Sequence, residues 1–192
     1  MIMSVTTRER IHQNNVDRTE VILNVENLSK VYVSSMGKVV SLRNVSFKVN
    51  KGEFVSVVGP SGSGKSTLLN MLGALDRPTS GKVYINGIDI FSLNDFQIAA
   101  IRNDTIGFIF QSYNLINRTT VLKNVEIPGI IGGMSDADRR RRALKLLDFL
   151  GIKDKANFQP LNLSGGQQQR VAIARALMSD PKIIFANAII FS

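Results

Sequence analysis

Residues 59–66 read Gly59-Pro60-Ser61-Gly62-Ser63-Gly64-Lys65-Ser66, which fits the pattern G-x-x-x-x-G-K-S. Glycines let a backbone turn tightly, so that its N–H groups converge on phosphate oxygens. In this pattern Lys65 is placed to reach the β- and γ-phosphates of a nucleotide, and the hydroxyl of Ser66 is placed to bind Mg²⁺. The stretch therefore predicts a phosphate-binding loop. The alternative is a strand-to-helix turn that holds no ligand.

The residues around the loop fit a strand before it and a helix after it. Phe54–Val58 is an apolar run rich in β-branched residues, which predicts a buried parallel strand. Ser66–Leu72 predicts a helix whose N-terminus adds a positive dipole to the anion site. Thr67, in the first turn of that helix, joins the predicted nucleotide-binding residues.

Size and composition narrow the class of protein. A chain of 192 residues can bury a real core in one domain, with room for a subdomain. The absence of cysteine excludes a disulfide framework and thiol chemistry. Residues 1–20 contain no apolar stretch that fits a secretory signal, and no run of about 18 apolar residues could span a bilayer. The cytoplasm is therefore the expected compartment.

The net charge of +9 could indicate nucleic-acid binding, but the distribution of the charges argues against it. The four consecutive arginines at positions 139–142 lie in a strongly helical segment, where successive residues point about 100° apart. They therefore do not form one stripe. A solvated basic surface is the simple interpretation, and contact with lipid headgroups or an acidic partner is the alternative. No nucleic-acid partner is expected.

The chain divides into a polar extension, a β-rich part and a helical part. Residues 1–20 carry no pattern and are expected to be a disordered extension of a domain that covers 21–192. Alternation of apolar and polar residues predicts antiparallel strands at 21–33 and 39–49, and a further strand at 82–90. A short helix at 95–102 and a strand at 105–110 follow.

A helical subdomain is expected over about 112–162, with a second helix after it. Ser135-x-x-Asp138 fits a capping box for a helix at 136–150 that stops at Gly151. Ser164 is placed to cap a helix at 165–178. A buried strand is then expected at 183–186.

A second glycine-containing motif, Leu163-Ser164-Gly165-Gly166-Gln167, opens the predicted helix at 165–178. A serine and two glycines at a helix start present N–H donors and a helix dipole to an anion. A capped helix start without a ligand is the alternative.

Together these motifs resemble the nucleotide-binding domains of ATP-binding-cassette proteins, from about residue 21 to residue 186. The resemblance implies an α/β P-loop NTPase fold with a central mixed sheet, an antiparallel β subdomain and a helical subdomain. It implies ATP and Mg²⁺ as cofactors, with Gln111 as a metal ligand beside Ser66. It also implies that the ring of Tyr32 stacks on adenine, although a tyrosine in a strand often serves packing alone.

In this family, residues like 163–167 hold the γ-phosphate of an ATP bound to the opposite protomer, so that a head-to-tail homodimer encloses two ATPs. The amino-acid sequence resembles that of the macrolide-exporter and lipoprotein-release branch in three segments: 69–78, 110–115 and the three glutamines 167–169. That branch implies an ATP-binding subunit of an exporter, peripheral on the inner face of the cell membrane. It would couple ATP binding and hydrolysis to transport through separate membrane-spanning subunits.

The sequence departs from the family after the strand at 183–186. The family places an Asp and a catalytic Glu there, and this chain has Asn187 and Ala188. No catalytic carboxylate is therefore expected to be intact. The only histidine, His12, is expected to be solvated, and the C-terminal part of the fold is expected to be missing.

Rival functions follow from this departure and from the phosphate loop. A truncated, non-hydrolysing remnant that binds ATP but has no transport activity is one alternative. A soluble cassette ATPase acting on DNA or ribosomes is another, but such proteins usually join two cassettes or insert long coiled coils. Kinases and GTPases also contain phosphate loops, but they are disfavoured here because their function does not require a motif like residues 163–167.

Overall fold

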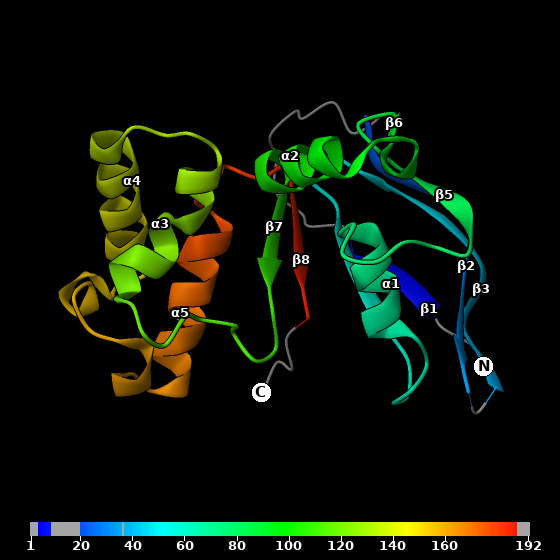
Figure 1. Cartoon of the computed structure of the whole chain (residues 1–192), viewed down its shortest axis with the longest axis horizontal. Helices are drawn as coiled ribbons and strands as arrows, with labels where there is room; N and C mark the ends of the chain where they lie inside the picture. The colour runs from blue at the N-terminus through cyan, green and yellow to red at the C-terminus, as the bar shows by residue number, and fades with distance from the viewer. Residues whose placement is uncertain (1–3, 9–19, 36, 188–192) are drawn as a thin grey trace. The chain divides into compact units, whose positions relative to one another are not determined.

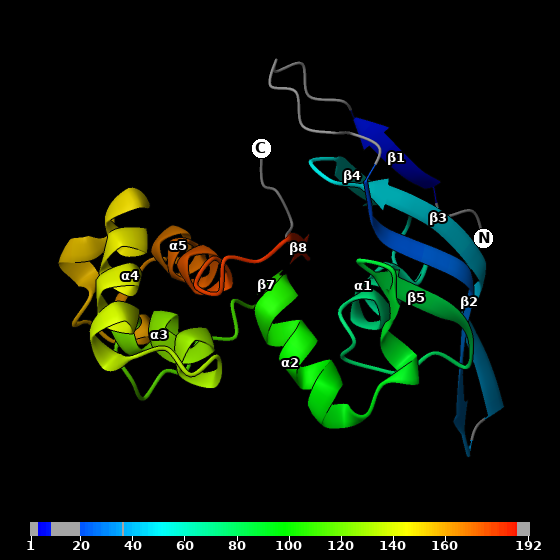
Figure 2. The ribbon, with the colours of Figure 1, turned by 90° about the horizontal axis from the view of Figure 1, so that it is seen from above.

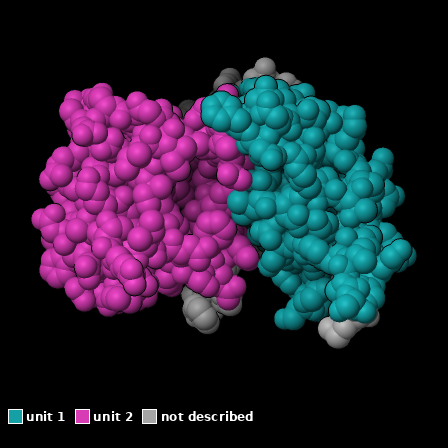
Figure 3. Space-filling view, in the orientation of Figure 1, with its two compact units in different colours: residues 1–98 teal, residues 99–192 magenta. Residues whose placement is uncertain are grey.

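The computed structural model describes residues 4–8, 20–35 and 37–187 of the chain. They belong to two compact units, unit 1 (residues 1–98) and unit 2 (residues 99–192), which are coloured separately in Figure 3. The phosphate loop and Tyr32 lie in unit 1. Gln111, the motif at 163–167 and Asn187 lie in unit 2.

Unit 1 contains a four-stranded antiparallel sheet in the order β3-β2-β5-β6 (Figure 1). Its members are β2 (Val21–Ser34), β3 (Gly37–Asn50), β5 (Ser80–Ile85) and β6 (Ile88–Asp89). Val83 and Ile85 are buried together because residues two apart in a strand share a face. The antiparallel layer predicted from residues 21–33 and 39–49 is confirmed.

The predicted strand at 82–90 is wrong at its end, because the chain reverses inside it. Asn86 and Gly87 both have positive φ angles, 50° and 76°, and form a two-residue turn between the paired residues Ile85 and Ile88. Asn-Gly is the sequence that suits such a turn, since both residues tolerate positive φ. A short 3₁₀ helix, η1 (Ile90–Ser92), follows β6.

Strand β4 (Phe54–Val58) precedes the phosphate loop and differs from its prediction. It pairs antiparallel with β1 (Ser4–Arg8), in a register from Ser4↔Val58 to Arg8↔Phe54. Phe54 and Val58 are 57% and 56% exposed, so β4 is neither a parallel strand nor a fully buried one. A strand edge offers unpaired N–H and C=O groups that a second strand can satisfy.

Strand β1 lies within residues 1–20, for which the sequence predicts a disordered extension. Residues 9–19, with His12, lie outside the described residues. Among the described residues the strands pair in three sheets. The four-stranded sheet agrees with the antiparallel β subdomain that the family resemblance implies beside a central mixed sheet.

Helix α1 (Lys65–Leu72) directly follows the loop. Leu68, Met71 and Leu72 are buried, at the spacing that places residues on one face of a helix. Figures 1 and 2 both show α1 lying against the antiparallel sheet, where it contacts β3. The buried face of α1 therefore fixes the loop to the sheet.

In unit 2, β7 (Ile106–Ile109) and β8 (Ile183–Ala186) pair in parallel, from Ile106↔Ile183 to Ile109↔Ala186. The N–H of Asn187 donates to the carbonyl of Ile109 at 2.9 Å, which extends this ladder by one bond. Helix α2 (Asp95–Thr105) leads into β7. These elements confirm the helix and strands predicted for this part of the chain. Strand β8 is not the buried strand that was predicted, because only Phe185 of its four residues is buried and Ile184 is 46% exposed.

Helices α3 (Val121–Ile131), α4 (Asp136–Phe149) and α5 (Gly165–Ala176) pack together in unit 2 (Figure 2). Two short 3₁₀ helices, η2 (Lys153–Lys155) and η3 (Pro160–Asn162), connect α4 to α5. Val125, Leu147 and Val171, one from each long helix, are completely buried in their shared core. Ser135 accepts from the N–H of Asp138 at 3.2 Å, and Gly151 ends the α4 region with φ 67°, as predicted.

Candidate nucleotide-binding site

The phosphate loop is held closed by Lys65. Its Nζ donates to the carbonyl oxygens of Gly59 at 2.7 Å and of Pro60 at 2.8 Å, and lies 3.5 Å from Ser63 Oγ. Gly62 and Gly64 take φ angles of 75° and 91°, a region that favours glycine. The loop thus curls around the ammonium group and places a positive charge at the start of α1.

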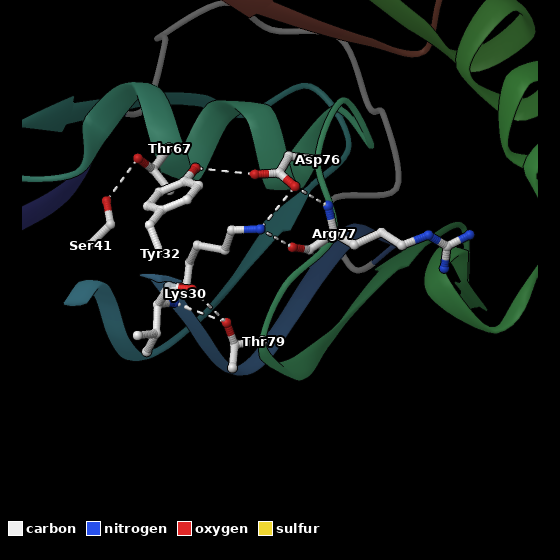
Figure 4. Close-up of polar contacts among 8 residues, drawn as sticks. Lys30, Tyr32, Ser41, Thr67, Asp76, Arg77 and Thr79 are labelled. Atoms are coloured by element: carbon white, nitrogen blue, oxygen red, sulfur yellow. Dashed lines mark hydrogen bonds and ion pairs between the residues drawn. The ribbon is translucent and has the colours of Figure 1, made fainter. Parts of the chain in front are cut away.

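The start of α1 suits an anion because nothing in its own cap competes for the N–H groups. Its N-cap residue is Gly64, which has no side chain to accept them, and its first turn carries no acidic residue. The hydroxyl of Ser41, on β3, donates to Thr67 Oγ1 at 2.8 Å and ties the first turn to the sheet (Figure 4). The N–H groups and dipole of α1 can therefore act on phosphate oxygens.

Tyr32 lies on β2 with 42% of its surface exposed, so its ring is not simply a core group. Its hydroxyl lies 3.1 Å from Asp76 Oδ2, and the ammonium of Lys30 lies 4.9 Å from the ring centroid (Figure 4). A partly exposed ring held by polar contacts can stack on a flat base.

The motif at 163–167 forms a complete capping box at the start of α5. Ser164 Oγ accepts from the N–H of Gln167 at 3.4 Å, and Gln167 Oε1 accepts from the N–H of Ser164 at 2.9 Å. Leu163 is buried and anchors the turn. The N–H groups of Gly165 and Gly166 take no part in the box, and no described atom lies within 4 Å of where a Cβ on Gly166 would stand.

Gln111 and Asn187 follow the carboxyl ends of the neighbouring parallel strands β7 and β8. Gln111 is exposed, in the segment just beyond Phe110. Open α/β sheets bind their ligands at the carboxyl ends of their strands, so side chains at these positions can contact a ligand. Ala188, the other position that departs from the family pattern, lies outside the described residues.

Arg175 holds the segment that follows Gln111. From α5 its two terminal nitrogens donate to the carbonyl oxygens of Asn114 at 2.6 Å and of Tyr113 at 2.7 Å. Both of these residues have positive φ angles, 48° and 57°. Burial lowers the pKa of Arg175, yet an arginine remains charged at neutral pH. Arg175 therefore links the helix of the 163–167 motif to the loop that carries Gln111.

Replacing Arg175 by methionine should lower the free energy of unfolding by about 2–3 kcal/mol, because two charge-assisted hydrogen bonds are lost from a partly buried site. Arg175→Lys should recover only part of this loss, since one ammonium cannot reproduce the planar fork. Urea unfolding followed by circular dichroism measures the change. Arg170→Met, on the exposed face of the same helix, is the matched control; equal losses in both variants would contradict the assigned role.

The comparisons with known proteins agree with this geometry. The sequence profile of the ABC transporter family matches residues 42–187. The chain belongs to the ABC transporter family. It is an ATP-binding subunit of the ABC type, and its solved neighbours are ABC cassettes of the P-loop NTPase fold, which confirms the predicted fold class.

The match to this ABC cassette spans most of the length of some relatives and only a small part of others. An uncharacterized ABC transporter ATP-binding protein of Thermotoga maritima is 52% identical over 166 residues, which span 86% of the cassette and 71% of that relative. The macrolide export ATP-binding/permease protein MacB of Vibrio parahaemolyticus is 44% identical over 169 residues. That match spans 88% of the cassette but 26% of MacB.

Among solved structures, a dimeric ABC transporter cassette of Methanocaldococcus jannaschii matches with a TM-score of 0.78 and 48% identity. The match covers 85% of this chain and 72% of that one. The same protein has also been solved as a dimer in a post-hydrolysis state with ADP and Pi. None of the helices in the described parts of our cassette is long and apolar enough to cross a membrane.

The side chains fit Mg²⁺ that arrives with a nucleotide. The residues described contain no cluster of three or more His, Cys, Asp or Glu that could hold a metal by itself. Mg²⁺ prefers oxygen ligands and is commonly held by one or two protein groups together with substrate phosphates. The hydroxyl of Ser66, in the first turn of α1, offers an oxygen ligand of this kind.

Sequence reasoning missed several residues that support the site. Lys30, Ser41, Asp76 and Arg175 each act through a partner on a different element, from 26 to 62 positions away along the chain. No local pattern marks such pairs. The only signal in the sequence was the presence of charged residues close to the motifs. Lys30 stands two residues before Tyr32, and Asp76 follows soon after α1.

Proposed function

We propose that this chain binds Mg²⁺–ATP at the phosphate loop and, as the ATP-binding subunit of an exporter, couples ATP binding and hydrolysis to transport through separate membrane subunits. The observation that carries the proposal is the loop closed around Lys65, whose ammonium lies 2.7 Å from the Gly59 carbonyl at the start of α1. The similarity to MacB, whose name states macrolide export, supports the direction of transport.

In the proposed complex the loop and the first turn of α1 bind the triphosphate. Lys65 exchanges its loop carbonyls for β- and γ-phosphate oxygens, and the N–H groups at the helix start donate to the same oxygens. When bound, Mg²⁺ supplies charge neutralisation between the phosphates; Ser66 and Gln111 are the residues that would hold it. Tyr32 stacks on the adenine ring. The nucleotide-binding residues are Tyr32, Gly59, Pro60, Ser61, Gly62, Ser63, Gly64, Lys65, Ser66 and Thr67.

We further propose that residues 163–167 bind the γ-phosphate of a nucleotide held by a second protomer, so that two chains pair head to tail. The unused N–H groups of Gly165 and Gly166 and the open space at Gly166 support this role. A dimeric relative supports the assembly. In this proposal the cassette domain covers 21–192, its helical part covers about 112–162, and the chain works at the inner face of the cell membrane.

A second candidate function is nucleotide binding with little hydrolysis, and Asn187 favours it. This residue continues the β8 ladder next to β7, at the position where the family has an aspartate that supports Mg²⁺ through water. An amide forms hydrogen bonds but brings no negative charge to the cation. Ala188 likewise cannot polarise an attacking water.

Under this second function, hydrolysis by the full chain should stay close to background, because loss of a general base alone costs about 10²–10⁴-fold in rate. Phosphate release per protomer, with and without Mg²⁺, measures it. The double variant Asn187→Asp, Ala188→Glu should raise the Mg²⁺-dependent rate. A robust rate in the parent that disappears in Lys65→Ala would instead show that another residue serves as the base, and would favour the fully active exporter subunit.

A further inference from the structure

The carboxylate of Asp76 accepts hydrogen bonds from three residues of unit 1. Its Oδ1 accepts from Lys30 Nζ at 2.8 Å and from the backbone N–H of Arg77 at 2.7 Å. Its Oδ2 accepts from the hydroxyl of Tyr32 at 3.1 Å, as Figure 4 shows. Lys30 also donates to the carbonyl of Arg77 at 2.6 Å. The carboxylate thus joins strand β2 to the segment that follows α1.

The charge of Asp76 suits this role. Burial alone would raise the pKa of its carboxyl, but the hydrogen bonds from Lys30, Arg77 and Tyr32, with the charge of Lys30, together lower it. Asp76 is therefore ionised at neutral pH and acts only as an acceptor. Tyr32 must then be the donor in their contact, which fixes where its hydroxyl points.

Lys30 sets the usable face of the ring. Its ammonium lies over Tyr32, 4.9 Å from the ring centroid, while its ion pair with Asp76 leaves it only 13% exposed. A planar base that stacks on Tyr32 must use the opposite face. The contacts of Asp76 and Lys30 therefore specify both the direction of the ring and the side on which it can receive a base.

The same carboxylate connects the ring to the phosphate loop through one helix. The loop ends at the N-terminus of α1, and Asp76 follows its C-terminus. After the C-terminus of α1 the chain turns at Ala74, which has a φ of 52°. The N–H of Leu75 then donates to the carbonyl of Asn70 at 2.8 Å. Helix α1 therefore carries the phosphate site at one end and the anchor of Tyr32 just beyond the other.

We propose that Asp76 is a positioning residue for nucleotide recognition: with Lys30, it holds Tyr32 at a fixed place relative to the phosphate loop, so that a purine base and its triphosphate are bound together. This inference rests on the proposed ATP binding. It assigns Asp76 an effect on the base half of the ligand and none on the phosphate half.

The test compares ATP with inorganic tripolyphosphate, both measured by displacement of a fluorescent ATP analogue from the full chain. Asp76→Ala should weaken ATP binding about tenfold and change tripolyphosphate binding by less than about twofold. Tyr32→Phe, which keeps the ring and removes the hydroxyl, should weaken ATP binding about threefold. The double variant should match Asp76→Ala alone, because the hydroxyl has no role once the carboxylate is gone.

Two further variants separate positioning from simple stability. Asp76→Asn keeps an oxygen that can accept from Tyr32 and should recover part of the ATP affinity. Asp95→Ala removes an aspartate that pairs with Arg77 at 2.7 Å and is 94% exposed, and it should leave both affinities unchanged. Asp76→Asn also serves as the test should the alanine variant fail to fold.

Each other outcome overturns the inference. Equal losses for ATP and tripolyphosphate in the Asp76 variants would show a structural role only. Unchanged ATP affinity in those variants, or effects of Tyr32→Phe and Asp76→Ala that multiply in the double variant, would show that Asp76 does not act through Tyr32. A parent chain that binds no ATP would overturn the proposed function itself, and this is seen before any variant is made.

Discussion

Replacing Lys65 by alanine should weaken ATP binding by about 2–3 kcal/mol, a loss of roughly 30- to 150-fold. The ammonium is the only side-chain cation within residues 59–66, and the loop already holds it by two carbonyl contacts of 2.7 and 2.8 Å. Little rearrangement is needed for it to meet a phosphate. The hydrogen bonds that it then donates are charge-assisted at both ends, which makes them strong.

Equilibrium titration with a fluorescent ATP analogue measures this effect. Lys51→Ala is the matched control, because Lys51 lies in the same unit, is half exposed and pairs only at the surface with Glu20 at 3.1 Å. The control should bind ATP as the parent does. Equal affinity in Lys65→Ala and the parent would remove the phosphate loop from the site.

Substituting alanine for Gly64 should destabilise the chain by at least about 2 kcal/mol and abolish ATP binding. Gly64 has φ 91°, and a Cβ there would overlap the carbonyl oxygen of Ser41 and stand 3.1 Å from Leu42 Cδ2. The Ser41 carbonyl belongs to β3 and cannot move without disturbing the sheet. The loop would have to shift instead, and with it the position of Lys65.

Gly52→Ala isolates the steric part of this effect. Gly52 has a similar φ of 78°, but no described atom lies within 4 Å of its Cβ position. It should therefore show only the cost of a left-handed backbone, about 1 kcal/mol. Thermal unfolding of both variants gives the comparison. The close approach of Gly64 to β3 would be refuted by a Gly64→Ala protein as stable as Gly52→Ala.

Local sequence patterns predicted those parts of the fold whose cause is local. The capping residues Ser135 and Ser164 marked the starts of α4 and α5 correctly, because a cap acts on N–H groups two or three residues away. The alternation of apolar and polar residues predicted β2 and β3, because this pattern too lies within one short segment of the chain. Even the missed hairpin had a local signal, Asn86-Gly87, which should have divided the predicted strand at 82–90.

Features that depend on distant partners could not be read in this way. The apolar run at 54–58 indicates a strand but contains nothing that selects β1 as its neighbour or antiparallel as its direction. The same holds for the site. The phosphate loop could be predicted because its ligands are backbone groups of one continuous segment, whereas the support of Tyr32 by Asp76 joins residues 44 positions apart.

The central claim is that ATP binds at the phosphate loop of this chain, and hydrogen–deuterium exchange tests it most directly. The full chain is labelled with and without Mg²⁺–ATP, and with AMP as a ligand that lacks the β- and γ-phosphates. We predict that Mg²⁺–ATP slows amide exchange in residues 59–67 and in the β2 segment around Tyr32, and that AMP leaves 59–67 unprotected. Exchange in 59–67 that is the same with and without Mg²⁺–ATP, at a concentration where binding is saturated, would contradict the account.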